Sequence, residues 1–148
     1  ARLEAVAKEK GVPAEEIIVC VLDRPRHEKL IAELRALGCG IMLIPDGDVA
    51  GVIATTNPDT TIDLYMGSGG APEGVLAAAA LRCVGGQFKG RLLFRNDDER
   101  RRAYKWGIED LDKTIVKPLG NATRKGPTMA VPRKCRSALI VIRTEGKV

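Results

Sequence analysis

The chain alternates apolar runs of strand length with segments that have helical spacing. Residues 17–22 form a continuous apolar, β-branched run, which is typical of a strand buried on both faces. A helix is predicted from Pro25 to Gly38, because proline suits a first helical turn and glycine commonly ends a helix. Residues 41–44 are predicted to be a second buried strand. The pattern indicates an α/β fold in which strands and helices alternate around a mainly parallel sheet.

A glycine-rich segment, residues 67–74, contains four glycines and one carboxylate, Glu73. It follows the apolar run 62–66 and precedes the alanine-rich run 75–81, so we expect a strand, a glycine loop and a helix in that order. Glycines allow positive φ, and free amides at a helix start attract anions. The segment therefore predicts a site for an anion or a metal ion.

The remaining elements are predicted from local patterns. Asp48 is expected to cap a short helix that ends near Thr55. Helices are predicted at residues 72–84 and 97–106, and strands at 88–94 and 137–143, whereas 113–136 has no usable periodicity. His27 is expected at the surface or in a helix cap, and Tyr104 and Trp106 are expected to pack internally.

Composition limits the class of protein. The 148 residues make one domain or part of a larger one, and only 3% of them are aromatic, so the core must be aliphatic. Four widely spaced cysteines without a C-x-x-C pair indicate buried, reduced thiols. No window approaches the roughly 18 apolar residues of a membrane span, and the start lacks a secretory signal, so we expect a soluble, cytoplasmic protein with no membrane contact.

The positive charge is concentrated in one segment. The formal net charge is +5, and residues 113–148 contain nine basic residues and one acid. Residues 1–112 therefore carry an excess of acids. Such a tail can bind a polyanion, but a solvated basic tail is the more common case, and no nucleic-acid-binding motif accompanies it.

Polar residues follow each of the first three predicted strands. They are Arg24 and Arg26 after the first, Asp46 and Asp48 after the second, and the glycine segment with Glu73 after the third. Because the carboxyl ends of parallel strands meet at one edge, these groups are expected to share a cleft. Guanidinium groups match phosphate oxygens, and carboxylates hold hydroxyls or divalent cations. The predicted ligand is a phosphorylated, hydroxyl-rich small molecule with Mg²⁺ or Mn²⁺.

The same residues also fit simpler structural roles. Surface solvation would account for the two arginines, and a turn with a helix cap would account for the two aspartates. Residues 46–48 resemble the start of a calcium loop, but the remaining ligands of an EF-hand are missing. The glycine segment has Pro72 where a dinucleotide motif has its third glycine, and no Gly-Lys-Ser/Thr follows for a P-loop. Nucleotide binding is therefore not expected.

At these residues the chain resembles the class II fructose bisphosphatases of bacteria. The resemblance rests on four segments in family order within residues 1–112, namely 21–27, 44–49, 66–80 and 90–94. It implies part of a two-domain sugar-phosphatase fold and hydrolysis of the 1-phosphate of fructose 1,6-bisphosphate with Mn²⁺ or Mg²⁺. The site residues that it implies are Arg24, Pro25 and Arg26 on the substrate phosphate, Asp46, Gly47 and Asp48 on the sugar, Gly70 on the substrate and Glu73 on a metal ion.

Two features depart from the family pattern. Its enzymes are about twice as long, and their N-terminal half supplies most of the metal-binding carboxylates, so this chain looks like the carboxyl-terminal portion and is expected to be nearly inactive alone. No catalytic residue is assigned in it. Residues 1–112 are expected to form an α/β sugar-phosphate-binding region, followed by a basic segment, 113–148, with a closing strand. Residues 120–127 do not match the family, and unusual divergence, a sequence error or an altered reading frame would each account for this.

Two alternatives to the enzyme remain. A non-catalytic sugar-phosphate-binding or regulatory module would keep the pocket without turnover, and a nucleic-acid binder would act through the basic tail, which we rank lower. The expected partners are a sugar bisphosphate and either a further copy of the chain or the missing N-terminal half, and sedoheptulose bisphosphate is not distinguished from fructose bisphosphate.

Overall fold

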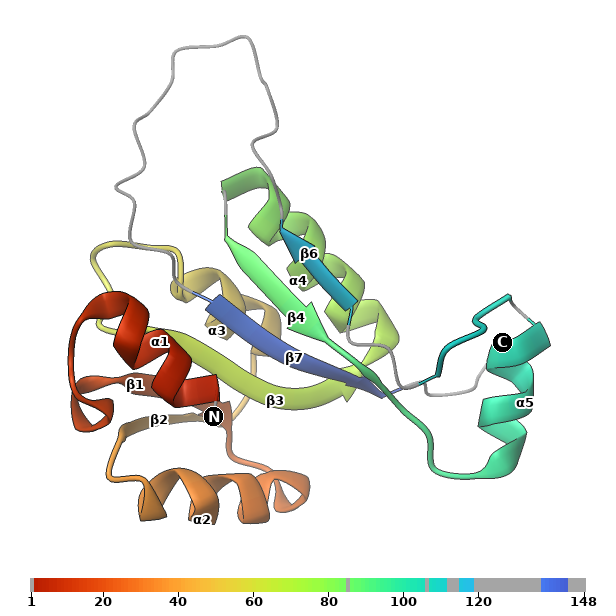
Figure 1. Cartoon of the computed structure of the whole chain (residues 1–148), viewed down its shortest axis with the longest axis horizontal. Helices are drawn as coiled ribbons and strands as arrows, with labels where there is room; N and C mark the ends of the chain where they lie inside the picture. The colour runs from red at the N-terminus through yellow and green to blue at the C-terminus, as the bar shows by residue number, and fades with distance from the viewer. Residues whose placement is uncertain (1, 85, 106, 112–114, 119–136, 144–148) are drawn as a thin grey trace, which may run out of the picture.

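The computed structural model describes residues 2–84, 86–105, 107–111, 115–118 and 137–143, and its strands form one mainly parallel sheet (Figure 1). The elements in chain order are α1 (Arg2–Lys10), η1 (Ala14–Glu16), β1 (Ile18–Leu22), η2 (Pro25–His27), α2 (Glu28–Ala36), β2 (Gly40–Ile44), α3 (Asp48–Ala54), β3 (Leu64–Gly70), α4 (Ala71–Val84), β4 (Gln87–Gly90), β5 (Leu92–Leu93), α5 (Asp97–Lys105), β6 (Ile115–Pro118) and β7 (Ser137–Arg143).

The strand order is β2-β1-β3-β7-β4-β6, and β5 pairs with β7. Every pairing is parallel except that of β4 with β6. The predicted mainly parallel α/β sheet is therefore confirmed. The predicted strand at 137–143 is β7, which lies between β3 and β4, so the last described segment of the chain is central to the sheet.

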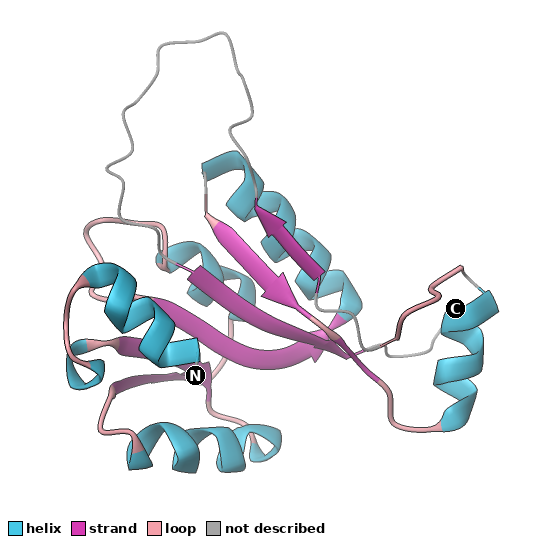
Figure 2. Cartoon of the chain, in the orientation of Figure 1, coloured by secondary structure: helices cyan, strands magenta, loops and turns pink. Residues whose placement is uncertain are grey.

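Helices cover both faces of the sheet (Figure 2). Alternate residues of β1 point to opposite layers: Val19 and Val21 pack with α1 and α2, whereas Cys20 packs with α3 and α4. β3 divides in the same way, with Leu64 on the first side and Tyr65 on the second. Burial on both faces explains why these runs are continuously apolar.

The prediction that residues 41–44 form a buried strand is wrong in one respect. The strand exists as β2, but Met42 and Leu43 are each 39% exposed. β2 is the edge of the described sheet, and the alternating helices cover it only partly. An exposed apolar edge is unusual for a monomeric surface.

Several smaller predictions differ from the structure. The strand predicted at 88–94 is two short strands, β4 and β5, and β6 lies in a stretch that has no clear periodicity. Cys20 and Cys39 are buried as expected, but Cys83 is exposed in the last turn of α4. Tyr104 is 56% exposed, because α5 buries Glu99 and Ala103 instead. Trp106 and Cys135 lie outside the described residues.

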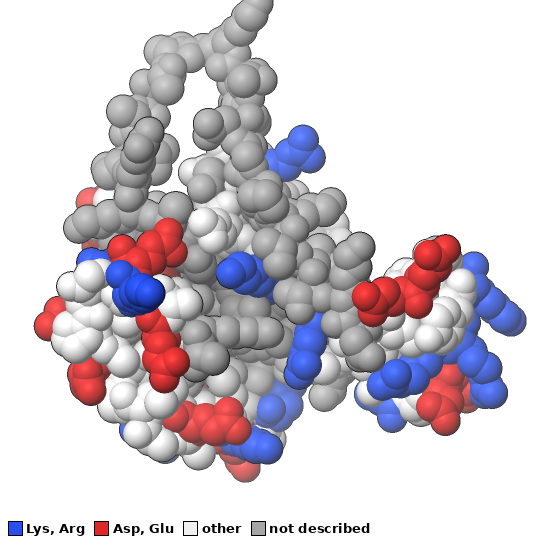
Figure 3. Space-filling view, in the orientation of Figure 1, with Lys and Arg blue, Asp and Glu red and all other residues white. Residues whose placement is uncertain are grey.

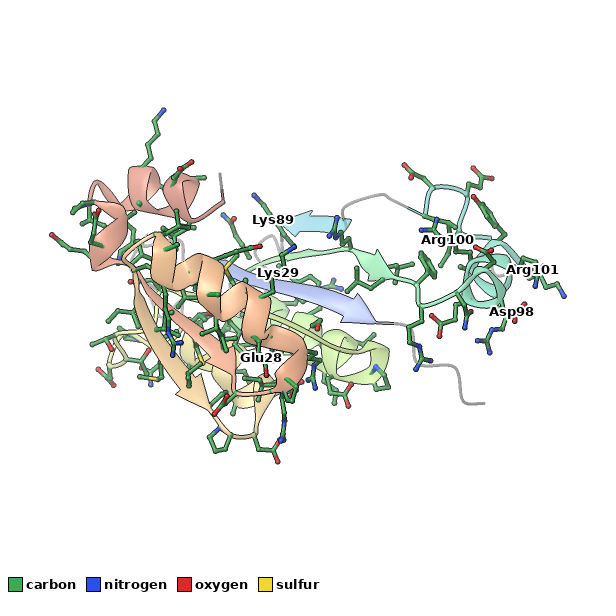
Figure 4. The ribbon with its side chains drawn as sticks, turned by 90° about the horizontal axis from the view of Figure 1, so that it is seen from below. Glu28, Lys29, Lys89, Asp98, Arg100 and Arg101 are labelled. Atoms are coloured by element: carbon green, nitrogen blue, oxygen red, sulfur yellow. The ribbon has the colours of Figure 1, made fainter. Side chains whose placement is uncertain are left out.

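The helix α5 confirms the polar helix predicted near residues 97–106 and stands apart from the sheet (Figure 1). Asp98, Arg100 and Arg101 project from it (Figure 4), and the Arg101 guanidinium pairs with the Asp98 carboxylate. Acidic and basic side chains lie together over this helix (Figure 3). Glu99, which is buried, accepts hydrogen bonds from the backbone N–H and the guanidinium of Arg95.

None of the helices in the described part of the chain combines the length and the apolar character that a bilayer span requires.

Asp63 joins α1 to the start of two strands. Its carboxylate is buried, with Oδ1 2.5 Å from Lys10 Nζ and Oδ2 accepting a hydrogen bond of 3.0 Å from Ile18 N–H. Its own N–H donates to Ile18 O at 2.9 Å. A buried carboxylate with two donors is stabilising only while both donors are present.

We expect Asp63→Ala to lower the free energy of unfolding by about 2–3 kcal/mol, because it leaves the Ile18 N–H and the Lys10 ammonium without their acceptor. Asp63→Asn should cost less, since the amide oxygen still accepts from Ile18. Urea unfolding followed by circular dichroism measures both. Asp59→Ala, at an exposed position nearby, is the control and should stay within about 0.5 kcal/mol. Equal stability of Asp63→Ala and the control would contradict the assigned role.

Candidate functional site

An open pocket lies at the carboxyl edge of the sheet, beside β3 and the starts of α3 and α4. Parallel topology explains this location, because successive crossovers bring the ends of β1, β2 and β3 together. The residues that line the pocket are Asp48, Val49, Tyr65, Gly67, Ser68, Gly69, Glu73, Gly74 and Ala77.

The glycine segment differs from the predicted loop. β3 continues through Gly70 in register with β7, and α4 begins at Ala71 with no residue between them. Positive φ among the described glycines occurs only at Gly11, Gly38, Gly47 and Gly107, so the glycines of β3 do not form a turn. Glycine by itself weakens a strand and favours a loop, but the pairing with β7 holds this segment as a strand.

The glycines of β3 serve close approach instead. A Cβ at Gly69 would stand 3.2 Å from Asp48 Oδ2, and one at Gly70 would collide with Glu73 Oε2. The missing side chains thus leave room for two carboxylates beside the backbone of β3, tightly at Gly69 and necessarily at Gly70. A methyl group at Gly70 would force the Glu73 side chain away.

Arg26 and His27, in η2, both bond to the backbone of Ser68. Arg26 Nε donates to Ser68 O at 2.9 Å. His27 Nε2 accepts from Ser68 N–H at 2.9 Å and lies 3.2 Å from Ser68 Oγ, while Nδ1 donates to Leu22 O at 2.9 Å. His27 occupies the N-cap position of α2, but its side chain makes no cap hydrogen bond, and the residue is only 2% exposed, so the predicted surface position is wrong. No local pattern identifies this role, because its partners come from two different strands.

The two aspartates of residues 46–48 are placed differently. Gly47 occupies the cap position of α3 with φ +83°, a conformation that favours glycine, so Asp48 is the first helical residue and not the cap. Asp48 Oδ1 accepts from Val49 N–H at 2.9 Å, and its carboxylate lines the pocket. Asp46 is exposed, accepts from Gly47 N–H at 2.8 Å, and is not among the lining residues.

Of the sequence-predicted site residues, Asp48 and Glu73 line the pocket, and Arg26 reaches it through Ser68. Arg24, Pro25 and Asp46 are exposed and do not line it. Gly70 is next to the lining and against Glu73. Sequence reasoning missed Tyr65 and Ser68, which lie in a predicted strand and in the predicted glycine loop respectively.

Tyr65 is almost completely buried beneath the pocket, with its hydroxyl 3.4 Å from the position of a Cβ on Gly67. Burial raises the pKa of its phenol well above the ordinary value, the negative charge of Asp48 and the Cys20 thiol raise it further, and Arg26 opposes them. Burial also raises the pKa of the thiol of Cys20, the register partner of Tyr65 on β1, to about 11. The Tyr65 hydroxyl therefore keeps its proton and can donate a hydrogen bond to a ligand.

The residues present fit only part of a metal site. Carboxylate oxygens are the ligands that Mg²⁺ and Mn²⁺ prefer, and Asp48 and Glu73 provide them at the pocket. Within the described ranges no group of three or more His, Cys, Asp or Glu side chains is placed to hold an ion. The described chain thus offers single ligands and not a complete coordination sphere.

We expect Tyr65 to stay neutral where an ordinary phenol ionises, near pH 10. The ultraviolet absorbance titration of the folded chain minus that of Tyr65→Phe should therefore contain no ionisation step near pH 10. Because the folded pKa lies above the unfolded one, the stabilisation from the neutral phenol is complete below the unfolded pKa and is lost as the pH rises through the folded pKa. An ionisation step near pH 10 in the difference would contradict burial of the hydroxyl.

Comparison with known proteins gives consistent results over most of the chain. The family described as "Bacterial fructose-1,6-bisphosphatase, glpX-encoded" matches residues 1–117. Fructose-1,6-bisphosphatase 1 class 2 of Escherichia coli (strain K12) is 47% identical over 105 residues, which cover 68% of this chain and 31% of the relative. The fructose-1,6-bisphosphatases class 2 of Escherichia coli O6:H1 and Shigella flexneri have the same identity and coverage. The chain spans 31% of the length of these curated relatives.

Proposed function

This chain belongs to the bacterial fructose-1,6-bisphosphatase family, and we propose that it supplies the sugar-phosphate contacts and a metal ligand of a metal-dependent enzyme that hydrolyses the 1-phosphate of fructose 1,6-bisphosphate. The observation that carries the proposal is the convergence of Arg26, Asp48 and Glu73 around one pocket at the carboxyl edge of the sheet. A cation for phosphate, a carboxylate for hydroxyls and a carboxylate for a metal ion are the groups that this reaction needs.

Arg26 is the proposed phosphate contact. Its Nε–H is directed to Ser68 O, and this bond orients the guanidinium plane while leaving the N–H groups of both terminal nitrogens for a ligand. Guanidinium pairs with phosphate bidentately, and a fixed plane loses less entropy on binding. Arg24 and Pro25, which are exposed in the same segment, would extend this contact.

Residues 46–48 are the proposed contact for the sugar. The Asp48 carboxylate faces the pocket, and hydrogen bonds from sugar hydroxyls to a charged acceptor are among the stronger ones. Asp46 and Gly47 would join it from the exposed turn. The neutral Tyr65 hydroxyl beneath the pocket adds a donor. Gly70, whose missing side chain leaves room for Glu73, is the proposed further contact with the substrate.

Glu73 is the proposed ligand for Mg²⁺ or Mn²⁺, in the first turn of α4. A divalent cation bound there would polarise the phosphate and lower the pKa of a coordinated water. Because the described residues offer no complete ligand set, we propose that the remaining ligands come from polypeptide outside them, in a longer protein or a second copy. The chain alone should then bind the sugar bisphosphate but hydrolyse almost none of it.

Arg26→Ala should weaken binding of fructose 1,6-bisphosphate in Mn²⁺ by about 1.5–3 kcal/mol, the range for a charge-assisted hydrogen bond. Isothermal titration calorimetry of the chain and the variant measures the difference. Arg35→Ala, which removes an exposed arginine from the last turn of α2, is the matched control and should leave the affinity unchanged. Affinities of the two variants that agree within error would remove Arg26 from the site.

Glu73→Gln should weaken Mn²⁺ binding by at least about tenfold. Removing a residue that only hydrogen-bonds to a metal ligand already lowers metal affinity by about tenfold or more, and Glu73 is proposed as a ligand itself. The free Mn²⁺ signal in electron paramagnetic resonance reports this without any turnover, and Glu33→Gln on α2 is the control.

The same titration tests the second candidate, a non-catalytic sugar-phosphate-binding module, which the absence of a three-ligand cluster in the described residues favours. Sugar bisphosphate binding that is independent of Mn²⁺ and of Glu73 would support that module and contradict the metal assignment.

A further inference from the structure

His27 is the only histidine of the chain, and its ring holds together two elements that the sheet does not join directly. β1 pairs with β3 at Val19↔Leu64 and Cys20↔Tyr65, and β3 then continues to Gly70 alongside β7. Beyond the last of those pairs, the side chains of η2 contact β3. Arg26 and His27 bond to the carbonyl and the amide of the same residue, Ser68.

The partners of the ring determine its protonation. Leu22 O can only accept a hydrogen bond, so His27 Nδ1, 2.9 Å away, must carry a proton. Ser68 N–H can only donate, so Nε2, also 2.9 Å away, must be without one. His27 is therefore neutral and in its Nδ1–H form. An imidazolium would direct a second N–H at the Ser68 N–H and break this contact.

We propose that His27 is a positioning residue for the pocket: by accepting the Ser68 N–H it holds the glycine segment of β3 against η2, so that Arg26 keeps a fixed place relative to Asp48 and Glu73. This inference rests on the proposed function, because the value of the fixed geometry lies in a ligand that contacts Arg26 and the pocket together. His27 itself touches no ligand in this scheme, since its two ring nitrogens are both engaged and its side chain is 2% exposed.

The tautomer is tested directly on the unmodified chain. Nitrogen-15 resonance of the imidazole at neutral pH should give one protonated nitrogen, Nδ1, and one unprotonated nitrogen, Nε2. A single histidine leaves no ambiguity of assignment. An Nε2–H ring or an imidazolium at neutral pH would overturn the proposal, and neither outcome depends on a ligand.

Two substitutions separate positioning from simple packing. The side-chain oxygen of His27→Gln can reach the place of Nε2 and accept from Ser68, whereas His27→Asn reaches only the place of Nδ1 and donates to Leu22. We expect amide hydrogen exchange at Ser68 to be unchanged in the Gln variant and faster by about tenfold in the Asn variant, the upper end for loss of one hydrogen bond. Fructose 1,6-bisphosphate affinity in Mn²⁺ should follow the same order.

Amide exchange at Ser68 and sugar bisphosphate affinity test different parts of the proposal. Equal exchange at Ser68 in the Gln and Asn variants, with both folded by circular dichroism, would overturn the role of His27 whatever the affinity. Different exchange rates with equal sugar bisphosphate affinities would also overturn it, because the ring would then hold the strand without positioning the site. Different exchange rates in a chain that binds no sugar bisphosphate would refute the proposed function, and with it the positioning of Arg26 for phosphate.

Discussion

The direct passage from β3 into α4 is the constraint on which the rest of the site depends. Gly70 ends the strand and Ala71 begins the helix, so the direction of β3 fixes the direction of the first turn of α4. Glu73, in that turn, therefore lies at the end of β3. Gly69 and Gly70 leave the space that the carboxylates of Asp48 and Glu73 occupy. The packing of α3 against α4 and the contacts of η2 with Ser68 are then built around a backbone that β7 holds in register.

The fold could be predicted from sequence wherever one local pattern had one structural solution. Residues 17–22 are apolar without interruption, and β1 is buried on both faces. Residues 41–44 have that pattern too, yet β2 is an edge, and the position of a strand in the sheet is a tertiary property that its own residues do not encode. The predicted loop at the glycines of β3 was wrong for a related reason, because the strand conformation of these glycines depends on pairing with a segment far along the chain.

The candidate site was predictable to the extent that topology brings strand ends together. That argument found Arg26, Asp48 and Glu73, which do converge, but it could not distinguish Asp48 from Asp46, or Arg26 from Arg24. The difference arises from the turn at Gly47, whose left-handed backbone carries Asp48 into α3 and leaves Asp46 outside. The role of His27 could not be predicted, because a single histidine two residues after a proline has the pattern of a surface residue until its two backbone partners are known.

Charge balance connects the metal to the substrate in the proposed function. The pocket brings two carboxylates, Asp48 and Glu73, near one guanidinium, Arg26, so it is net negative before any ligand arrives. A phosphate dianion entering such a pocket would meet like charge at close range, where the surrounding protein screens less than water does. A divalent cation held by Glu73 would reverse the sign of that interaction. On this argument the cation and the sugar bisphosphate should each raise the affinity for the other, because the coupling between two binding events is reciprocal.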